Sequence, residues 1–194
     1  ADVPTAYPDL AQRALAHGIA GSSAGGEFPK FTAQSEIDGE PVSVIVKFSG
    51  ADDSPAVRRW SDLLVCEHLA LETLTAELGI ESARSTIRQH AGRTFLEVAR
   101  FDRVGPHGRL PLCSLGALQG ALLGMPGATW PAVAEVLHRN GWLPAEDVSR
   151  IRLLWWFGRL IANADMHDGN LSFRPGLSLA PAYDMLPMDY APLR

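Results

Sequence analysis

The hydrophobic pattern changes its period near the middle of the chain, and this change limits the folds that are open to it. In the first half, apolar and polar residues alternate in short runs, which is typical of strands with one buried face. Four strands are predicted there, at 31–37, 41–48, 84–90 and 93–99. In the second half, apolar residues recur at the spacing of helices. Three helices are predicted there, at 114–123, 130–139 and 145–162.

Strands that come first and helices that follow favour an α+β fold of two lobes over an alternating β/α fold. We expect a small β-rich N-lobe at 1–98 and a mainly helical C-lobe at 99–194, with the hinge near 97–103. The N-lobe is also expected to hold two helices, at 9–20 and 61–78. The C-lobe is also expected to hold a small hairpin, made of 171–174 and 178–181.

A lysine ends the second predicted strand on the face opposite its valines. Side chains alternate along a strand, so Ser43, Ile45 and Lys47 share one face. A lysine there could reach phosphate groups across a cleft as a point charge. The alternative is a solvated strand end.

Glu67 follows twenty residues after Lys47, inside the predicted helix 61–78. It occupies a position of the helix stripe where an apolar residue is expected. A lysine on a strand paired with a glutamate on the next helix is the arrangement of protein kinases. The alternatives are an exposed helix acid at Glu67, or pairing through Glu72 or Glu77.

The run NADMHDGN at 163–170, followed by YDM at 183–185, carries the strongest chemical signal. Asp165 and Asn170 have the interval of the Asp and Asn in a kinase catalytic loop. Asp165 could accept a hydroxyl proton, while Asn170 and Asp184 could offer the hard oxygen ligands that Mg²⁺ prefers. His167 lies within the run and could orient it. The alternative is that Asp and Asn are common loop residues.

The segment GSSAGGEFPK at 21–30 is rich in glycine and precedes the first strand pair. Backbone N–H groups in such a turn can hold phosphate oxygens. Its candidate phosphate-binding residues are Ser22, Ser23, Ala24, Gly25, Gly26 and Lys30. The segment matches neither the Walker pattern nor G-x-G-x-x-G, so a plain tight turn is the alternative.

Charge and composition exclude several classes of protein. The net charge of −5 argues against broad nucleic-acid binding. No apolar run is long enough to span a membrane, and the first ten residues lack the pattern of a signal peptide. The two cysteines have no metal-binding spacing. We expect a cytoplasmic chain that binds neither a membrane nor nucleic acid directly.

Six segments occur in an order that resembles a known family: GSSAGGEFPKF, VIVKFS, CEHLALETLTAELGI, VARFDR, NADMHDGN and LAPAYDMLP. Together they are similar to the HipA-type serine/threonine kinases, the toxins of bacterial toxin–antitoxin modules. The resemblance runs from Gly21 to Pro187 and implies a two-lobed protein-kinase-like fold that uses ATP and Mg²⁺. Family members are longer than this chain, and Met185-Leu186 stands where D-F-G kinases have Phe and Gly.

The resemblance also implies roles for single residues. Asp165 would be the catalytic base, Asn170 and Asp184 the magnesium ligands, and Lys47 a contact to the nucleotide phosphates. Ala99, through its backbone, and Phe101, through its ring, would contact adenine at the hinge. Ser23, with Ser22 as the close alternative, would be a regulatory phosphorylation site in the glycine-rich segment, which Lys30 would end.

Three functions are compatible with these residues. The first is transfer of the γ-phosphate of ATP to a protein hydroxyl. The resemblance implies an aminoacyl-tRNA synthetase as one target class and a DNA-binding antitoxin as partner. The second is phosphorylation of a small molecule by the same Asp, Asn and Asp. The third is a non-catalytic nucleotide-binding module.

Overall fold

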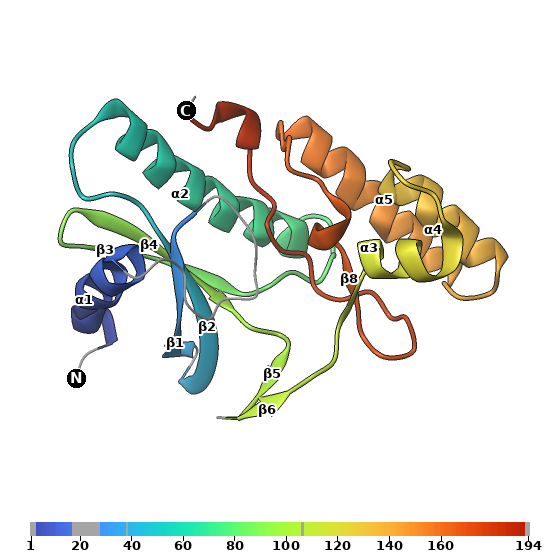
Figure 1. Cartoon of the computed structure of the whole chain (residues 1–194), viewed down its shortest axis with the longest axis horizontal. Helices are drawn as coiled ribbons and strands as arrows, with labels where there is room; N and C mark the ends of the chain where they lie inside the picture. Colours follow the sequence, from blue (N-terminus) through green and yellow to red (C-terminus); the bar gives the residue numbers. More distant parts are fainter. Residues whose placement is uncertain (1–2, 17–27, 38, 106, 193–194) are drawn as a thin grey trace.

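The computed structural model describes residues 3–16, 28–37, 39–105 and 107–192. A β-sheet with one long helix lies on one side of the molecule, and a group of helices lies on the other (Figure 1). The glycine-rich residues Ser22, Ser23, Ala24, Gly25 and Gly26 lie outside the described residues.

The sheet has four antiparallel strands in the order β1-β2-β4-β3. The strands are β1 (Lys30–Ile37), β2 (Glu40–Phe48), β3 (Ser85–His90) and β4 (Arg93–Ala99). Each begins and ends within one residue of its predicted bounds. The two hairpins, β1–β2 and β3–β4, are closed by short connections, and Ala91 and Gly92 both have positive φ in the second. Two positive φ values give a turn whose twist matches that of the flanking strands.

The two faces of β2 serve different purposes. Val44, Val46 and Phe48 form a core cluster with the first helix, α1 (Val3–Ala16). Ile45 and Lys47 point to the opposite face, where they line a cavity. The predicted alternation of this strand is therefore confirmed.

Helix α1 begins before the predicted bounds of 9–20 and ends at Ala16; residues 17–20 lie outside the described part of the chain. Pro8 lies inside it, although proline is unfavourable in the interior of a helix. Packing determines where the helix begins, because Tyr7 and Ala11 are almost completely buried against the sheet.

A buried carboxylate fixes α1 to the sheet. Oε1 of Glu97, on β4, accepts hydrogen bonds from the Tyr7 hydroxyl at 2.6 Å, from Ser35 Oγ at 3.2 Å and from Arg88 Nε at 2.9 Å. The Glu97 side chain is fully buried. Burial, together with this carboxylate, raises the pKa of Tyr7, so the phenol remains a donor.

Replacing Tyr7 with phenylalanine is therefore expected to lower the free energy of unfolding by about 1.5–3 kcal/mol, because it removes a hydrogen bond to a buried charged group. Urea unfolding of the variant and the wild type measures the difference. The variant Tyr190→Phe, at an exposed tyrosine, is the control and should unfold like the wild type. Equal stability of Tyr7→Phe and the wild type would contradict this account of α1.

The long helix α2 (Pro55–Ala76) starts six residues before the predicted 61–78. Ser54 caps it, since its side chain accepts a hydrogen bond from Val57 N, and Pro55 occupies the first turn. The apolar stripe, from which the prediction was made, begins only at Leu63. The second half of α2 packs into the main core beside the C-lobe helices.

The helices of the second half match their predicted positions closely. They are α3 (Leu115–Leu118), which continues as a π-helical turn (Gln119–Leu123), α4 (Trp130–Arg139) and α5 (Ala145–Leu160). Their core includes Trp130, Leu137, Ile151 and Leu154. In the described residues, no helix is long and apolar enough to cross a membrane.

Short strands lie before α3 and after α5. They are β5 (Arg103–Val104), β6 (Gly108–Arg109), β7 (Cys113–Ser114) and β8 (Ser172–Phe173). β5 pairs with β6, and β7 pairs with β8. The hairpin predicted for 171–174 and 178–181 is present: Phe173 and Leu179 form an antiparallel bridge, and Arg174 N and Ala180 N donate to Ser178 O and Ser172 O, both at 2.9 Å.

Backbone contacts join the two sides of the molecule behind the hinge. Ala182 donates to Glu81 O and accepts from Ala83 N, both at 2.9 Å, in a parallel bridge with Ser82. Arg174 forms an ion pair with Glu81 nearby, at 3.0 Å. The segment that leads to Asp184 is thereby attached to the loop between α2 and β3.

Candidate active site

A cavity of about 500 Å³ lies between the sheet and the loops of the C-lobe. Seven of the predicted site residues line it: Lys30, Lys47, Ala99, Phe101, His167, Asn170 and Asp184. They come from β1, β2, β4, the hinge and two loops of the second half. Residues far apart in the sequence are thus brought to one concave site, as is usual for small-molecule sites.

Lys47 is the centre of an ionic cluster at this cavity. Its Nζ lies 2.7 and 2.8 Å from the two carboxylate oxygens of Glu67, on α2. It also donates to Oδ1 of Asp184. Lys47 and Glu67 are buried, while the Asp184 side chain is one-third exposed. The ion pair between Lys47 and Glu67 that the sequence predicted is present, and Lys47 has Asp184 as a further partner.

The charges of the cluster determine its protonation. Burial alone would raise the pKa of Asp184, but the Lys47 cation outweighs it and lowers that pKa. Burial alone would lower the pKa of Lys47, but Asp184 and Glu67 outweigh it and raise that pKa. Lys47 therefore stays charged at neutral pH, and Asp184 stays ionised beside it.

Lys30 lies on β1 directly opposite Lys47 in the strand register. Burial lowers the pKa of Lys30, because a desolvated ammonium is less stable than a hydrated one. Two cations therefore face the same cavity from neighbouring strands. An anionic ligand such as a phosphate chain suits this position.

The predicted catalytic loop is held by backbone hydrogen bonds. Nδ2 of Asn170 donates to Asp165 O at 2.8 Å, so the amide oxygen of Asn170 is the atom left to bind a cation. Nδ1 of His167 accepts from Gly169 N at 3.0 Å, which caps the short helical turn 168–170. Asp165 is half-buried and does not line the cavity itself.

Asn163 was not among the predicted site residues, but it contacts two of them. It is almost fully buried, and its Oδ1 accepts from Asp165 N at 3.0 Å. Its Nδ2 donates to Asp184 O at 3.3 Å. Asn163 therefore ties together the two segments that carry the predicted base and metal ligand. Its place at the start of NADMHDGN was the available signal.

Asp184 has a φ of +54°, a conformation that few side chains adopt easily. Aspartate tolerates this region better than most residues. The turn lets the Asp184 carboxylate point to Lys47, while its carbonyl meets Asn163. A strained backbone held by such contacts is frequent at functional sites.

Tyr183 was also missed. Its hydroxyl donates to Gly169 O at 2.6 Å and lies 2.7 Å from Ser172 Oγ. Its ring lies 5.6 Å from that of Phe101, at the hinge. Burial raises the pKa of Tyr183 to about 12, so it acts here as a neutral donor. It links the hinge to the catalytic loop across the cavity.

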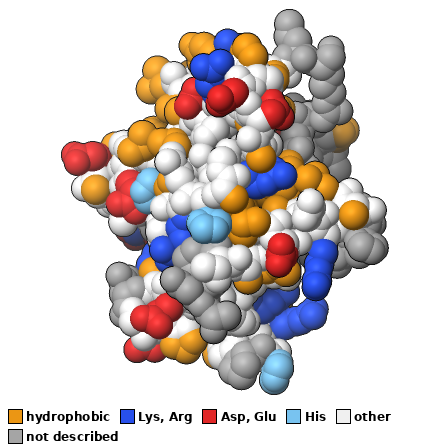
Figure 2. All heavy atoms as spheres, turned by 90° about the vertical axis from the view of Figure 1, so that its left-hand side faces the viewer, with side chains coloured by type: hydrophobic (Ala, Val, Ile, Leu, Met, Phe, Trp, Pro, Cys, Tyr) orange, Lys and Arg blue, Asp and Glu red, His pale blue; other side chains and the backbone are white. Residues whose placement is uncertain are grey.

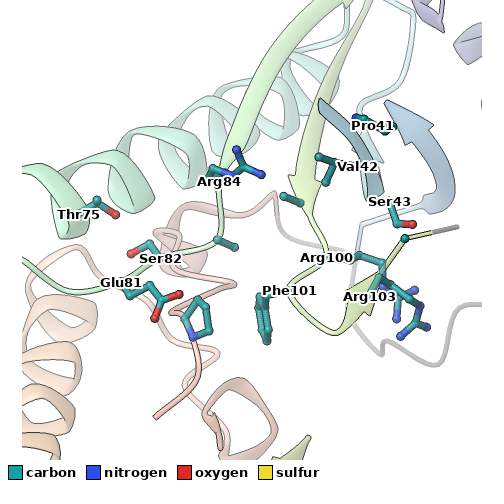
Figure 3. A pocket seen from close by; sticks show the side chains of 14 residues that line it. Pro41, Val42, Ser43, Thr75, Glu81, Ser82, Arg84, Arg100, Phe101 and Arg103 are labelled. Carbon is teal, nitrogen blue, oxygen red and sulfur yellow. The ribbon is translucent and has the colours of Figure 1, made fainter. Parts of the chain in front are cut away.

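A second pocket, of about 540 Å³, lies behind the hinge (Figure 3). Glu81 and Ser82 lie on one side of it and Arg100 and Arg103 on the other, with the Phe101 ring between them. Ala99, Arg100 and Phe101 line this pocket and the first cavity alike. The hinge residues therefore separate the second pocket from the cavity of the candidate site.

The donor set fits a hard divalent cation. Asp184 supplies an ionised carboxylate, and Asn170 supplies an amide oxygen whose orientation its own N–H₂ group fixes. Mg²⁺ is commonly bound by one or two such groups, with water and phosphate oxygens completing its coordination. Asn170 and Asp184 line the same cavity as Lys30 and Lys47.

Known structures share this fold. The HipA of Shewanella oneidensis MR-1, solved with HipB and operator DNA, aligns with a TM-score of 0.60 and 20% identity over 87% of this chain and 44% of that chain. The proinflammatory kinase CtkA of Helicobacter pylori aligns with a TM-score of 0.58 and 16% identity, over 84% of this chain and 54% of that chain. The predicted two-lobed, kinase-like α+β fold is therefore confirmed.

Sequence comparison gives a nearer relative. The chain is 44% identical to Toxin YjjJ of Escherichia coli (strain K12) over 192 residues, which are 97% of this chain and 43% of the relative. The chain thus spans less than half the length of that protein. The family model described as the HipA-like C-terminal domain matches residues 22–193. This chain therefore belongs to the HipA-like C-terminal domain family, as the resemblance of its ordered motifs predicted.

Proposed function

We propose that this chain is the catalytic core of a serine/threonine protein kinase that transfers the γ-phosphate of ATP to a protein hydroxyl. The observation that carries the proposal is the contact of Lys47 with both Glu67 and Asp184 at a cavity that Asn170 also lines. A buried lysine paired with a helix glutamate, beside a loop aspartate that can bind Mg²⁺, is the arrangement that kinases use at the ATP phosphates.

Each side chain has a place in this mechanism. The ATP phosphates would lie against Lys47 and Lys30, whose charges balance those of the phosphate oxygens. Asn170 and Asp184 would hold Mg²⁺, which supplies further neutralisation of phosphate charge when bound. Asp165 would accept the proton of the attacking hydroxyl, from a backbone position that Asn163 and Asn170 fix.

The adenine would lie at the hinge, against Ala99 and Phe101. Both line the cavity. Asp102 follows them and also lines the cavity. The proposed boundary between the lobes, at residue 98, falls just before this segment, and β4 ends at Ala99.

We also propose that the protein acts as the toxin of a toxin–antitoxin pair. The Escherichia coli relative is named a toxin, and the Shewanella HipA was solved with HipB and operator DNA. A DNA-binding antitoxin is the partner that these names support. The regulatory phosphorylation of Ser23 or Ser22, and an aminoacyl-tRNA synthetase as target, remain predictions from the sequence.

Phosphate transfer from labelled ATP tests the proposal. The chain is incubated with labelled ATP and Mg²⁺, with Mg²⁺ removed by a chelator in a parallel sample, and label in protein is measured. Label that needs Mg²⁺ and is absent in Asp165→Asn supports a working kinase. Loss of self-labelling in Ser23→Ala would place the phosphorylated residue in the glycine-rich segment. Binding of ATP without any transfer, to protein or to small hydroxyl compounds, would instead favour a non-catalytic module.

A further inference from the structure

A polar hollow of about 440 Å³ adjoins the cavity of the candidate site. It is lined by Thr32, Gln34 and Ser43 from the sheet, and these residues share the face of Lys47 because they alternate with the core residues of β1 and β2. Its other wall holds three arginines and a histidine: Arg100, Arg103, Arg109 and His107. We call this hollow the arginine pocket.

Two of these arginines are held in fixed positions. Arg100 donates from Nε and Nη2 to the two carboxylate oxygens of Asp102, at 2.9 and 2.7 Å. Arg103 donates to the same carboxylate and to Asp102 O. These bonds use only part of the five N–H donors of each guanidinium. The remaining donors are therefore oriented in advance for a ligand.

Arg109 has no such partner. It is exposed, and no described residue forms an ion pair with it. The described lining of the pocket includes no carboxylate. Asp102 pairs with Arg100 and Arg103, and Arg109 adds a third guanidinium, so the cluster has an excess of about two positive charges at neutral pH. Figure 2 shows Lys and Arg side chains gathered at the lower right of the face that it presents.

Hydroxyl and amide groups complete the pocket. Gln34 donates from Nε2 to Ser43 Oγ at 2.8 Å, which leaves the Ser43 hydroxyl hydrogen to point elsewhere. Ser43 O also accepts from Arg100 N at 2.8 Å, and Figure 3 labels Ser43 close to Arg100 and Arg103. The pocket thus combines guanidinium forks with a neutral donor, the combination that recognises a phosphate group.

We propose that the arginine pocket binds the phosphate group of a phosphorylated serine or threonine presented by a partner protein. A phosphomonoester carries about −1.5 to −2 charges at pH 7, which matches the excess charge of the cluster. Arginine clusters are the usual means of recognising phosphorylated side chains.

A nucleic-acid ligand fits the site less well. The described lining has no Phe, Tyr or Trp ring on which a base could stack, and its single imidazole, that of His107, is exposed. The chain as a whole is acidic, with a net charge of −5, whereas proteins that follow a nucleic-acid backbone carry an extended basic surface. The positive charge here is confined to one small hollow, which suits a single phosphate group.

A ligand in the arginine pocket would also affect residues that line the neighbouring cavity. Arg100 lines both hollows, and Asp102 lines the cavity while holding Arg100 and Arg103. A bound phosphate would compete with Asp102 for the same guanidinium groups. This inference does not depend on catalysis by the chain, since binding at the arginine pocket needs neither ATP nor Asp165.

Calorimetric titration with O-phosphoserine tests the proposal. Binding to the wild type is expected, with about tenfold weaker affinity in Arg109→Gln, because a charge-assisted hydrogen bond is lost. Arg109→Lys, which keeps the charge but not the fork, should fall between the two. Arg139→Gln, at the exposed end of α4, is the matched control and should bind like the wild type.

Two further titrations can overturn the assignment. Phosphoserine binding that is weakened by Lys30→Gln and unchanged in Arg109→Gln would place the phosphate in the cavity instead. A short single-stranded oligonucleotide that binds more tightly than phosphoserine, with the same dependence on Arg109, would make nucleic acid the ligand. No binding of phosphoserine to the wild type would also refute the proposal.

Discussion

Replacing Lys47 with methionine is expected to lower the free energy of unfolding by about 3–5 kcal/mol, the usual effect of removing one partner from a buried ion pair. The fully buried Glu67 carboxylate would lose the cation that lies 2.7 and 2.8 Å from its oxygens. Asp184 would lose the same partner. Methionine fills much of the volume of lysine, so the loss of stability measures the missing charge more than a change in packing.

The double variant Lys47→Met/Glu67→Gln separates charge from shape. It removes the unpaired buried carboxylate, so urea unfolding should show recovery of a large part of the lost stability, while ATP binding stays weak. Full stability in the single variant, or no recovery in the double variant, would contradict the role given to Lys47.

The pH dependence of the single variant has a defined sign. Burial raises the pKa of Glu67, and removing Lys47 removes a cation that opposes this rise. The folded state then binds a proton more readily than the unfolded state, so the stability of the variant increases as the pH falls through the raised pKa. The free energy of unfolding of the variant should therefore come closer to that of the wild type in mild acid. Unfolding curves collected at several pH values measure it.

Replacing Asp165 with asparagine is expected to reduce the rate of phosphate transfer by about 10²–10⁴-fold, the usual contribution of a general base. Folding should not change, because the fixed contacts of Asp165 are made by its backbone N–H and C=O, which asparagine keeps. ATP binding should also persist, since Asp165 does not line the cavity. Single-turnover transfer of labelled phosphate and a separate ATP titration measure the two effects.

Asp168→Asn is the matched control, because Asp168 lies three residues further along the same loop. Its Oδ2 accepts from Gln119 Nε2 at 3.0 Å, on the side of the loop that contacts the helices. Its transfer rate should stay within a few-fold of the wild type, since the change leaves the base intact. Equal losses in both variants would indicate a structural effect on the loop, and an active Asp165→Asn would exclude Asp165 as the base.

The strands could be predicted from the sequence, whereas two helix starts could not. In β2, alternation separates Val44 and Val46 from Lys47, and short connections on both sides of the sheet fix the register. The start of α2 depends instead on the Ser54 cap and Pro55, and residues 55–59 lack the buried stripe that the prediction used. The start of α1 depends on packing of Tyr7 against distant strands, which no local pattern contains.

The site residues could be predicted where a family motif fixes the number of residues between them. Lys47 and Glu67 meet, and Asn170 and Asp184 line one cavity with Lys47. Asn163 and Tyr183 could not be assigned, because their hydrogen bonds join backbone atoms that only the folded chain brings together. The assignment of Ser23 and its neighbours stays a prediction, since they lie outside the described residues.

The parallel bridge between Ser82 and Ala182 limits how the cleft can widen. Its two backbone hydrogen bonds lie behind the hinge, two residues before Asp184. A rotation of the sheet away from the C-lobe that preserves these bonds would pivot near the bridge. Asp184 would then keep its place relative to the bridge, because only Tyr183 separates it from Ala182 in the chain. Opening of the cleft would therefore leave the Asp184 carboxylate near the pivot, where its position changes least.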